Sequence, residues 1–143
     1  MFGNDRDSLR RYYCTVWEKA RAGQPLEPLE QIIAEAIREH PEYQPVLTDA
    51  ETALGREYTP EQGQTNPFLH LGMHIAIREQ LGANRPAGIL DVYQRLCRRA
   101  GDTHAAEHRM MECLGETLWE AQRAGREPDE RAYLERLWRL ARA

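Results

Sequence analysis

Residues 67–82 of the chain read PFLHLGMHIAIREQLG, and this stretch decides the predicted fold. Thr65 or Asn66 can cap a helix here, with Pro67 at its first position, which is the arrangement that helix N-termini favour. Apolar side chains occupy most of the circumference of this helix. Such a pattern is typical of a central, buried helix, so the sequence predicts that residues 67–82 form a helical element of the core.

The segments on both sides of this stretch also have helical patterns, bounded by glycine and proline. Further helices are expected over residues 5–22, 28–40, 86–100, 102–125 and 128–138.

The part of the chain before residue 67 is less regular. Residues 43–47 and 50–54 could each form a turn or two of helix, and residues 55–66 have the composition of a long loop. No segment alternates between apolar and polar residues with a period of two, so no β-strand is expected. The predicted fold is all-α: a single domain over residues 1–143, built as an antiparallel bundle of about six helices.

The apolar stripe of the first predicted helix indicates which side faces the core. Its members are Leu9, Tyr12, Tyr13, Val16, Trp17 and Ala20. Cys14 lies off this stripe and is expected to face solvent.

Composition narrows the classes of function. The net charge of −4 argues against nucleic acid as a partner. No apolar run approaches the roughly 18–20 residues that a membrane span requires, and the polar start does not resemble a signal peptide. The three cysteines form no CxxC pair, which favours free thiols in a reducing compartment. We therefore expect a cytoplasmic protein that neither enters a membrane nor binds nucleic acid.

Four of the five histidines form two pairs with the same spacing. His70 and His74 lie in the central helix, and His104 and His108 lie in the helix predicted over residues 102–125. Residues four positions apart share one face of a helix. Helices present two imidazoles to one transition-metal ion with this spacing. The four histidines are therefore candidate metal ligands.

Acidic residues near the second pair extend the candidate site. At about 100° per residue, Glu107 and Glu112 flank His104 and His108, whereas Cys113 points to the opposite side. Each glutamate is a candidate carboxylate ligand, general base or orienting residue. Imidazole with carboxylate suits zinc or iron first, with nickel or copper as alternatives. By the same construction, Glu79 points away from His70 and His74.

Other interpretations of these histidines remain open. A histidine pair on a packed face can be satisfied by backbone carbonyls, acidic groups or buried water. His40 continues an apolar stripe and is a further candidate ligand, although a cap or core role suits a lone histidine near a helix end better. Residues 104–108, HAAEH, match the H-x-x-E-H pattern of inverted zinc proteases. Those enzymes are far larger, so a peptidase is not favoured and enzymatic activity is left open.

The alternative hypothesis is a non-enzymatic interaction module without metal. The predicted helices carry more apolar faces than a small core needs, and such faces can form a homodimer or bind a protein partner. A mass in solution above one chain and the absence of stoichiometric metal would favour this alternative.

Four stretches of the sequence resemble an uncharacterised bacterial family, the domain of unknown function DUF1841. They are MFGNDRDSLRR (1–11), QPLEPLEQIIAEAIREHPEY (24–43), EQGQTNPFLHLGMHIAIREQ (61–80) and AAEHRMMECLGETLWEAQRAG (105–125). The resemblance covers nearly the whole chain. It implies a stand-alone cytoplasmic protein of proteobacterial type, and it supplies no activity, cofactor or catalytic residues.

Overall fold

The structure, a computed structural model, describes residues 5–56, 58 and 66–142. Every regular element in these ranges is helical, which confirms the all-α prediction. The elements are α1 (Asp5–Arg21), α2 (Pro28–Arg38), the 3₁₀ turn η1 (Pro41–Tyr43), α3 (Gln44–Thr48), α4 (Ala50–Gly55), α5 (Pro67–Ala83), α6 (Ile89–Ala100), α7 (Thr103–Ala124) and α8 (Glu130–Arg142).

The predicted elements are found where the sequence pattern indicated. Six helices of 11 to 22 residues correspond to the predicted long helices. The short helices α3 and α4 occupy the two segments for which a turn or two was expected. Most of the predicted loop over residues 55–66 lies outside the described ranges.

The chain divides into two compact units, Met1–Ile75 and Ala76–Ala143, and the boundary falls inside α5. Each unit is described by itself below. The prediction of a single domain stays a prediction.

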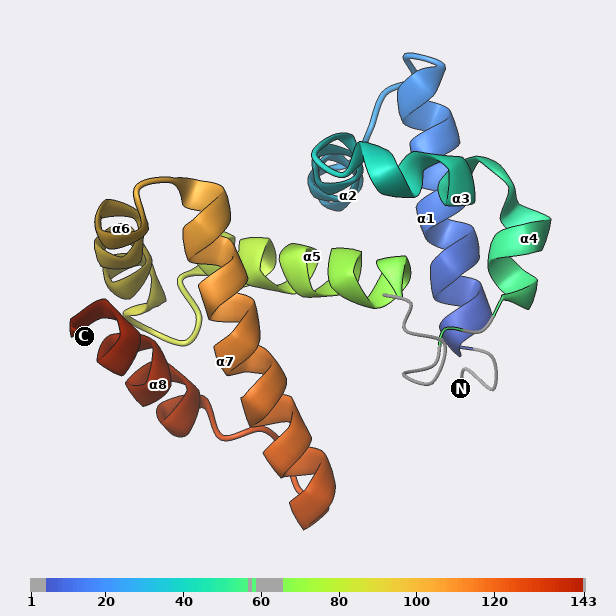
Figure 1. Cartoon of the computed structure of the whole chain (residues 1–143). Coiled ribbons are helices and arrows are strands. Elements are labelled where there is room, and N and C mark those ends of the chain that lie inside the picture. Colours follow the sequence, from blue (N-terminus) through green and yellow to red (C-terminus); the bar gives the residue numbers. More distant parts are fainter. Residues whose placement is uncertain (1–4, 57, 59–65, 143) are drawn as a thin grey trace. The chain divides into compact units, whose positions relative to one another are not determined.

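In the first unit, α1 contacts α2, α3 and α4 (Figure 1). The core between these helices is closed by fully buried aliphatic side chains, including Val16, Ile33, Ile37 and Leu71. Gly72 of α5 lies close to α1, because a Cβ at this position would be 3.6 Å from the Tyr13 hydroxyl oxygen. Burial of this apolar surface is the main stabilising contribution to the unit.

The buried face of α1 differs from the predicted stripe. Leu9 and Tyr12 are exposed, whereas Arg10 and Cys14 are buried beside Tyr13. The expectation that Cys14 faces solvent is therefore wrong. The inward face is rotated relative to the predicted stripe, and the guanidinium of Arg10 finds hydrogen-bond acceptors inside the unit.

The start of α2 shows how local chemistry fixes a helix end. A carboxylate oxygen of Glu30 accepts a hydrogen bond of 2.8 Å from the Glu27 backbone N–H, outside the regular helical pattern. The Lys19 ammonium group, on α1, donates to both carboxylate oxygens of Glu30 at 2.9 and 3.0 Å. The backbone bond, followed by the bond from Lys19, lowers the pKa of Glu30. These contacts join the start of α2 to α1.

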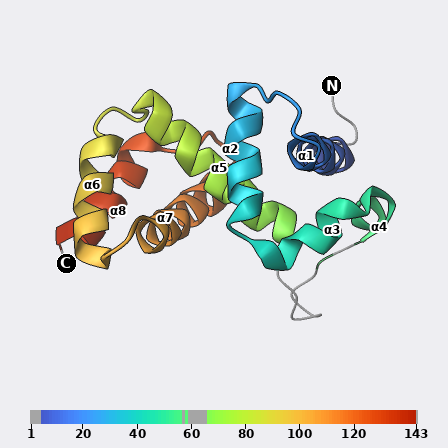
Figure 2. The ribbon, with the colours of Figure 1, turned by 90° about the horizontal axis from the view of Figure 1, so that it is seen from above.

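In the second unit, α6, α7 and α8 contact one another (Figure 1 and Figure 2). Glycines end two of these helices as the sequence predicted, since Gly101 after α6 and Gly125 after α7 have φ values of 90° and 67°. A positive φ strains residues that carry a Cβ, and glycine adopts it without this cost. Ile89, Leu96 and Leu137 are fully buried in this unit.

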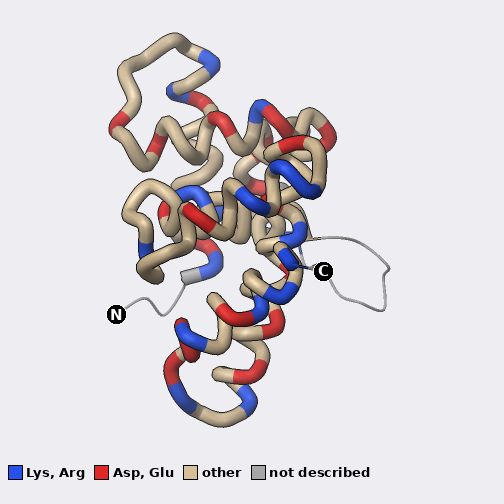
Figure 3. Tube along the Cα trace, turned by 90° about the vertical axis from the view of Figure 1, so that its left-hand side faces the viewer, with Lys and Arg blue, Asp and Glu red and all other residues tan. Residues whose placement is uncertain are grey.

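Charged side chains of both signs follow one another along the individual helices (Figure 3). This interspersed pattern is typical of solvated helix faces. Among the described helices, none is both long enough and apolar enough to cross a membrane.

Candidate metal-binding sites

Three histidines gather in the first unit. His70 and His74 project from α5, and His40 directly precedes η1, after the end of α2. The ring centroid of His40 lies 5.1 Å from that of His70 and 4.6 Å from that of His74. The ring centroids of His70 and His74 are 4.8 Å apart. His40 and His74 are buried, and His70 is half-buried. We call His40, His70 and His74 the histidine trio.

Two nitrogens of the trio lie at a distance that suits a shared ion. The Nε2 atoms of His70 and His74 are 3.2 Å apart. Two nitrogens bound tetrahedrally to zinc, at about 2.0–2.1 Å each, are about 3.3 Å apart. A ring nitrogen of His40 also lies within 4.8 Å of one of His74. The His40 and His70 rings are also neighbours, with their centroids 5.1 Å apart.

A backbone contact fixes the tautomer of His40. Its Nδ1 lies 2.7 Å from the carbonyl oxygen of Ala36, one turn earlier in α2. A carbonyl oxygen only accepts, so Nδ1 must carry the proton. In the neutral ring, Nε2 then holds the lone pair, which is the form that binds a metal ion. Orientation of a ligating imidazole by a backbone carbonyl is a common feature of metal sites.

Tyr43 supports the trio from η1. Its ring stacks on His40 with a centroid distance of 5.4 Å and an interplanar angle of 4°. It also meets His70 edge-on at 5.9 Å. Burial, followed by the charge of Glu42, raises the pKa of Tyr43. The packed Tyr43 ring restricts the His40 and His70 side chains. Because its raised pKa keeps the hydroxyl protonated, it adds no charge.

The second histidine pair lies at the start of α7, in the second unit. The Asp102 carboxylate accepts a hydrogen bond of 2.7 Å from the Ala105 backbone N–H and so caps this helix. One turn of helix brings the rings of His104 and His108 to a centroid distance of 4.2 Å, at an angle of 78°. A ring nitrogen of each lies within 4.8 Å of one of the other. Both side chains are half-buried.

The acid between these two histidines is bound to a basic residue. Oε1 of Glu107 lies 3.0 Å from Nε of Arg78, which projects from α5. Glu107 is buried, and the Arg78 side chain is 17% exposed. Burial, followed by interactions with Cys97 and then with Glu107, raises the pKa of neighbouring Tyr93 to about 12. The Glu107 carboxylate therefore lies in an environment with little solvent, next to the positive charge of Arg78.

The structure brings together the two members of each predicted pair. It also adds His40 to the first pair; the signal for this residue was its place on the apolar stripe of α2. Glu112 and Glu79 are exposed, whereas Cys113 is buried. Sequence reasoning did not identify Tyr43 or the ion pair of Glu107 with Arg78, because neither follows from spacing within one helix.

The imidazole nitrogens of these sites limit which metal ions could bind and what chemistry a bound ion could perform. Neutral imidazoles bind zinc, iron, nickel and copper in preference to magnesium or calcium. Three histidine ligands leave at least one coordination position for water or another ligand. A metal ion held in this way could act as a Lewis acid.

A family model described as "Domain of unknown function (DUF1841)" matches residues 5–139. No curated protein and no solved structure matches the chain. The description of the family names no reaction.

Proposed function

The chain belongs to the DUF1841 family, as its sequence resemblance predicted, and we propose that it binds a transition-metal ion through histidine nitrogens. Zinc or iron is the favoured ion, with nickel or copper as alternatives. The histidine trio supports this proposal most directly, because two of its three rings are buried and the Nε2 atoms of His70 and His74 are 3.2 Å apart.

The other predicted site residues take different parts in the proposal. His104 and His108 are further metal ligands, since their spacing repeats that of His70 and His74. Glu107 acts as an orienting residue, because Arg78 already binds its carboxylate. Glu112 is exposed and can reach an ion only at the edge of a site. No catalytic residue is assigned.

The test is the metal content of protein purified without a histidine tag. We expect a stoichiometric transition metal in the natural chain and the loss of one whole equivalent in a His70→Gln/His74→Gln variant, because both Nε2 ligands are lost. Elemental analysis by mass spectrometry measures this content. A Glu79→Gln variant, altered at an exposed site on the same helix, is the matched control and should keep its metal. Circular dichroism verifies that each variant is folded.

A parallel variant separates the two histidine groups. His104→Gln/His108→Gln should also lower the metal content, and the loss is read against the stoichiometry of the natural chain. If each double variant loses one of two ions, the groups bind separately. If each variant loses the same single ion, they share it. Unchanged metal content in both variants, or a natural chain without metal after purification and reconstitution, would refute the proposal.

A second candidate function is self-association, which one feature of α7 favours. Leu118 and Trp119 are adjacent and are 41% and 58% exposed. Large apolar side chains exposed side by side are characteristic of interfaces. We expect the natural chain to form a dimer that Trp119→Glu converts to a monomer, whereas Leu29→Glu, at another exposed leucine, leaves it intact. Light scattering coupled to size exclusion measures the mass; a monomeric natural chain would eliminate this candidate.

A further inference from the structure

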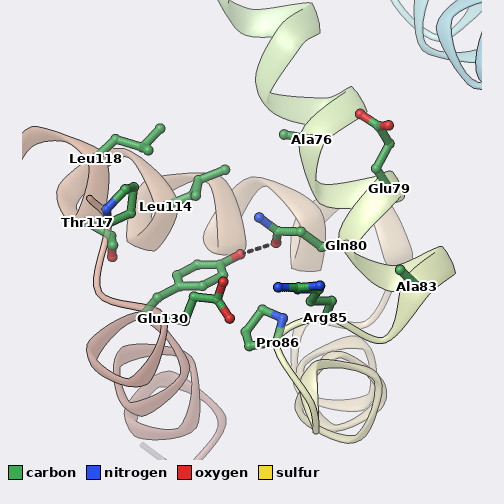
Figure 4. A pocket seen from close by; sticks show the side chains of 12 residues that line it. Ala76, Glu79, Gln80, Ala83, Arg85, Pro86, Leu114, Thr117, Leu118 and Glu130 are labelled. Atoms are coloured by element: carbon green, nitrogen blue, oxygen red, sulfur yellow. Dashed lines mark hydrogen bonds between the residues drawn. The ribbon is translucent and has the colours of Figure 1, made fainter. Parts of the chain in front are cut away.

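A cavity of about 540 Å³ lies within the second unit (Figure 4). It is bounded by the second half of α5, the α5–α6 connection, α7 and the start of α8. Its walls are largely apolar and include Ala76, Pro86, Leu114 and Leu118. Ligand sites are typically cavities of about 300–1,000 Å³ with apolar walls and a few polar groups. The cavity has the size and lining of a small-molecule site.

A hydrogen bond fixes one polar group of the wall. The Tyr133 hydroxyl donates to Oε1 of Gln80 at 2.7 Å, drawn as the dashed line in Figure 4. Burial, followed by the charge of Cys113, raises the pKa of Tyr133, so this hydroxyl keeps its proton. Since Oε1 of Gln80 is the acceptor, the amide nitrogen is turned the other way, towards Leu114 in Figure 4. This hydrogen bond orients the Gln80 amide, whose N–H group can donate to a ligand.

Opposite charges lie on two sides of the cavity. The Arg85 guanidinium and the Glu130 carboxylate point towards one another in Figure 4, whereas the carboxylate of Glu79 is turned away from Gln80 and Arg85. Arg85 belongs to the α5–α6 connection, and Glu130 is the first residue of α8. Within the part of the chain that the structure describes, neither residue forms an ion pair. The cavity therefore presents a positive and a negative group beside an apolar interior.

We infer that this cavity binds a free α-amino acid with an apolar side chain. The Arg85 guanidinium binds the carboxylate of the ligand, with the Gln80 amide as a second donor, and Glu130 binds the ammonium group. The apolar side chain lies against Leu114 and Leu118. A ligand that carries both charges can contact Arg85 and Glu130 at once, whereas a ligand with a single charge can be attracted by only one of them. A zwitterion satisfies both.

The test compares L-phenylalanine with two analogues that each lack one charge. N-acetyl-L-phenylalanine lacks the ammonium charge, and L-phenylalaninamide lacks the carboxylate. We expect L-phenylalanine to bind the full chain at least tenfold more tightly than either analogue, a factor that corresponds to about 1.4 kcal/mol. Titration followed by ¹⁵N–¹H correlation spectra gives the affinities, and the shifted resonances should include Gln80 and Leu114.

Two variants assign the charges. Arg85→Gln should weaken L-phenylalanine about tenfold and leave L-phenylalaninamide unchanged, whereas Glu130→Gln should weaken L-phenylalanine and leave the N-acetyl form unchanged. Arg99→Gln, at an exposed position on α6, is the matched control and should not alter binding. No shift with L-phenylalanine at its solubility limit would overturn the inference. Equal affinity for all three compounds, or an Arg85→Gln variant that binds like the natural chain, would also overturn it.

Discussion

Replacing Glu107 with Met should lower the free energy of unfolding by about 2–3 kcal/mol, one of the two largest losses that we expect from a single substitution. The carboxylate is buried and lies 3.0 Å from Nε of Arg78. Without it, the guanidinium loses the Glu107 carboxylate in a site from which solvent is largely excluded. Urea unfolding followed by circular dichroism measures the loss.

A double-mutant cycle distinguishes this ion pair from general disruption of α7. Arg78→Met should cost about as much as Glu107→Met, whereas the double variant should cost little more than either single variant, giving a coupling free energy of about 2–3 kcal/mol. Glu112→Met, on the same helix but exposed, should stay within about 0.5 kcal/mol of the natural chain. Additive losses in the cycle would show that Arg78 and Glu107 do not stabilise one another.

A further variant, Glu107→Gln, compared with Glu107→Met, determines what Glu107 does at the histidine pair. An orienting residue acts through its partner, so Glu107→Gln, which can still accept a hydrogen bond from Arg78, should retain the metal content better than Glu107→Met. A direct carboxylate ligand would be impaired by both substitutions. Metal content measured beside stability therefore separates an orienting role from ligation.

Local signals in the sequence were sufficient for the helices. Gly101 and Gly125 end α6 and α7 where the pattern indicated, and Pro67 begins α5. These signals act over a few residues, through φ preferences and the loss of a backbone donor at proline. They report where an element begins and ends, and they carry no information about its partners in space.

Contacts between elements explain what the sequence left out of the candidate sites. The pairing of His70 with His74 follows from helical spacing alone, whereas the approach of His40 depends on how η1 and α2 pack near α5. The pairing of Glu107 with Arg78 likewise joins two helices. A periodicity argument treats each helix separately, so it selects candidate residues without their neighbours.

Arg10 is the clearest case in which the residue type gave the wrong prediction of burial. Arginine is seldom fully buried, and Arg10 was not part of the apolar stripe predicted for α1. Its side chain is nevertheless only 2% exposed. Its NH1 group donates to the carbonyl oxygens of Ala53 at 2.7 Å and Arg56 at 2.6 Å. These carbonyls lie at the end of α4, where a helix leaves acceptors without partners of its own. Arg10, on the buried face of α1, supplies donors to these acceptors.

Arg10→Met should therefore destabilise the chain by about 2–4 kcal/mol, because two carbonyls lose a charged donor and the methionine side chain cannot replace it. The loss of the guanidinium, which lies 4.8 Å from the centre of the Phe68 ring, adds a smaller cation–π contribution. Arg11→Met, one position along the same helix and exposed, is the matched control and should stay within about 0.5 kcal/mol. Amide hydrogen exchange adds a local readout, since the N–H groups of α4 should lose protection in Arg10→Met well before those of α2. Equal unfolding midpoints for the two variants would show that the carbonyls at the end of α4 do not depend on Arg10.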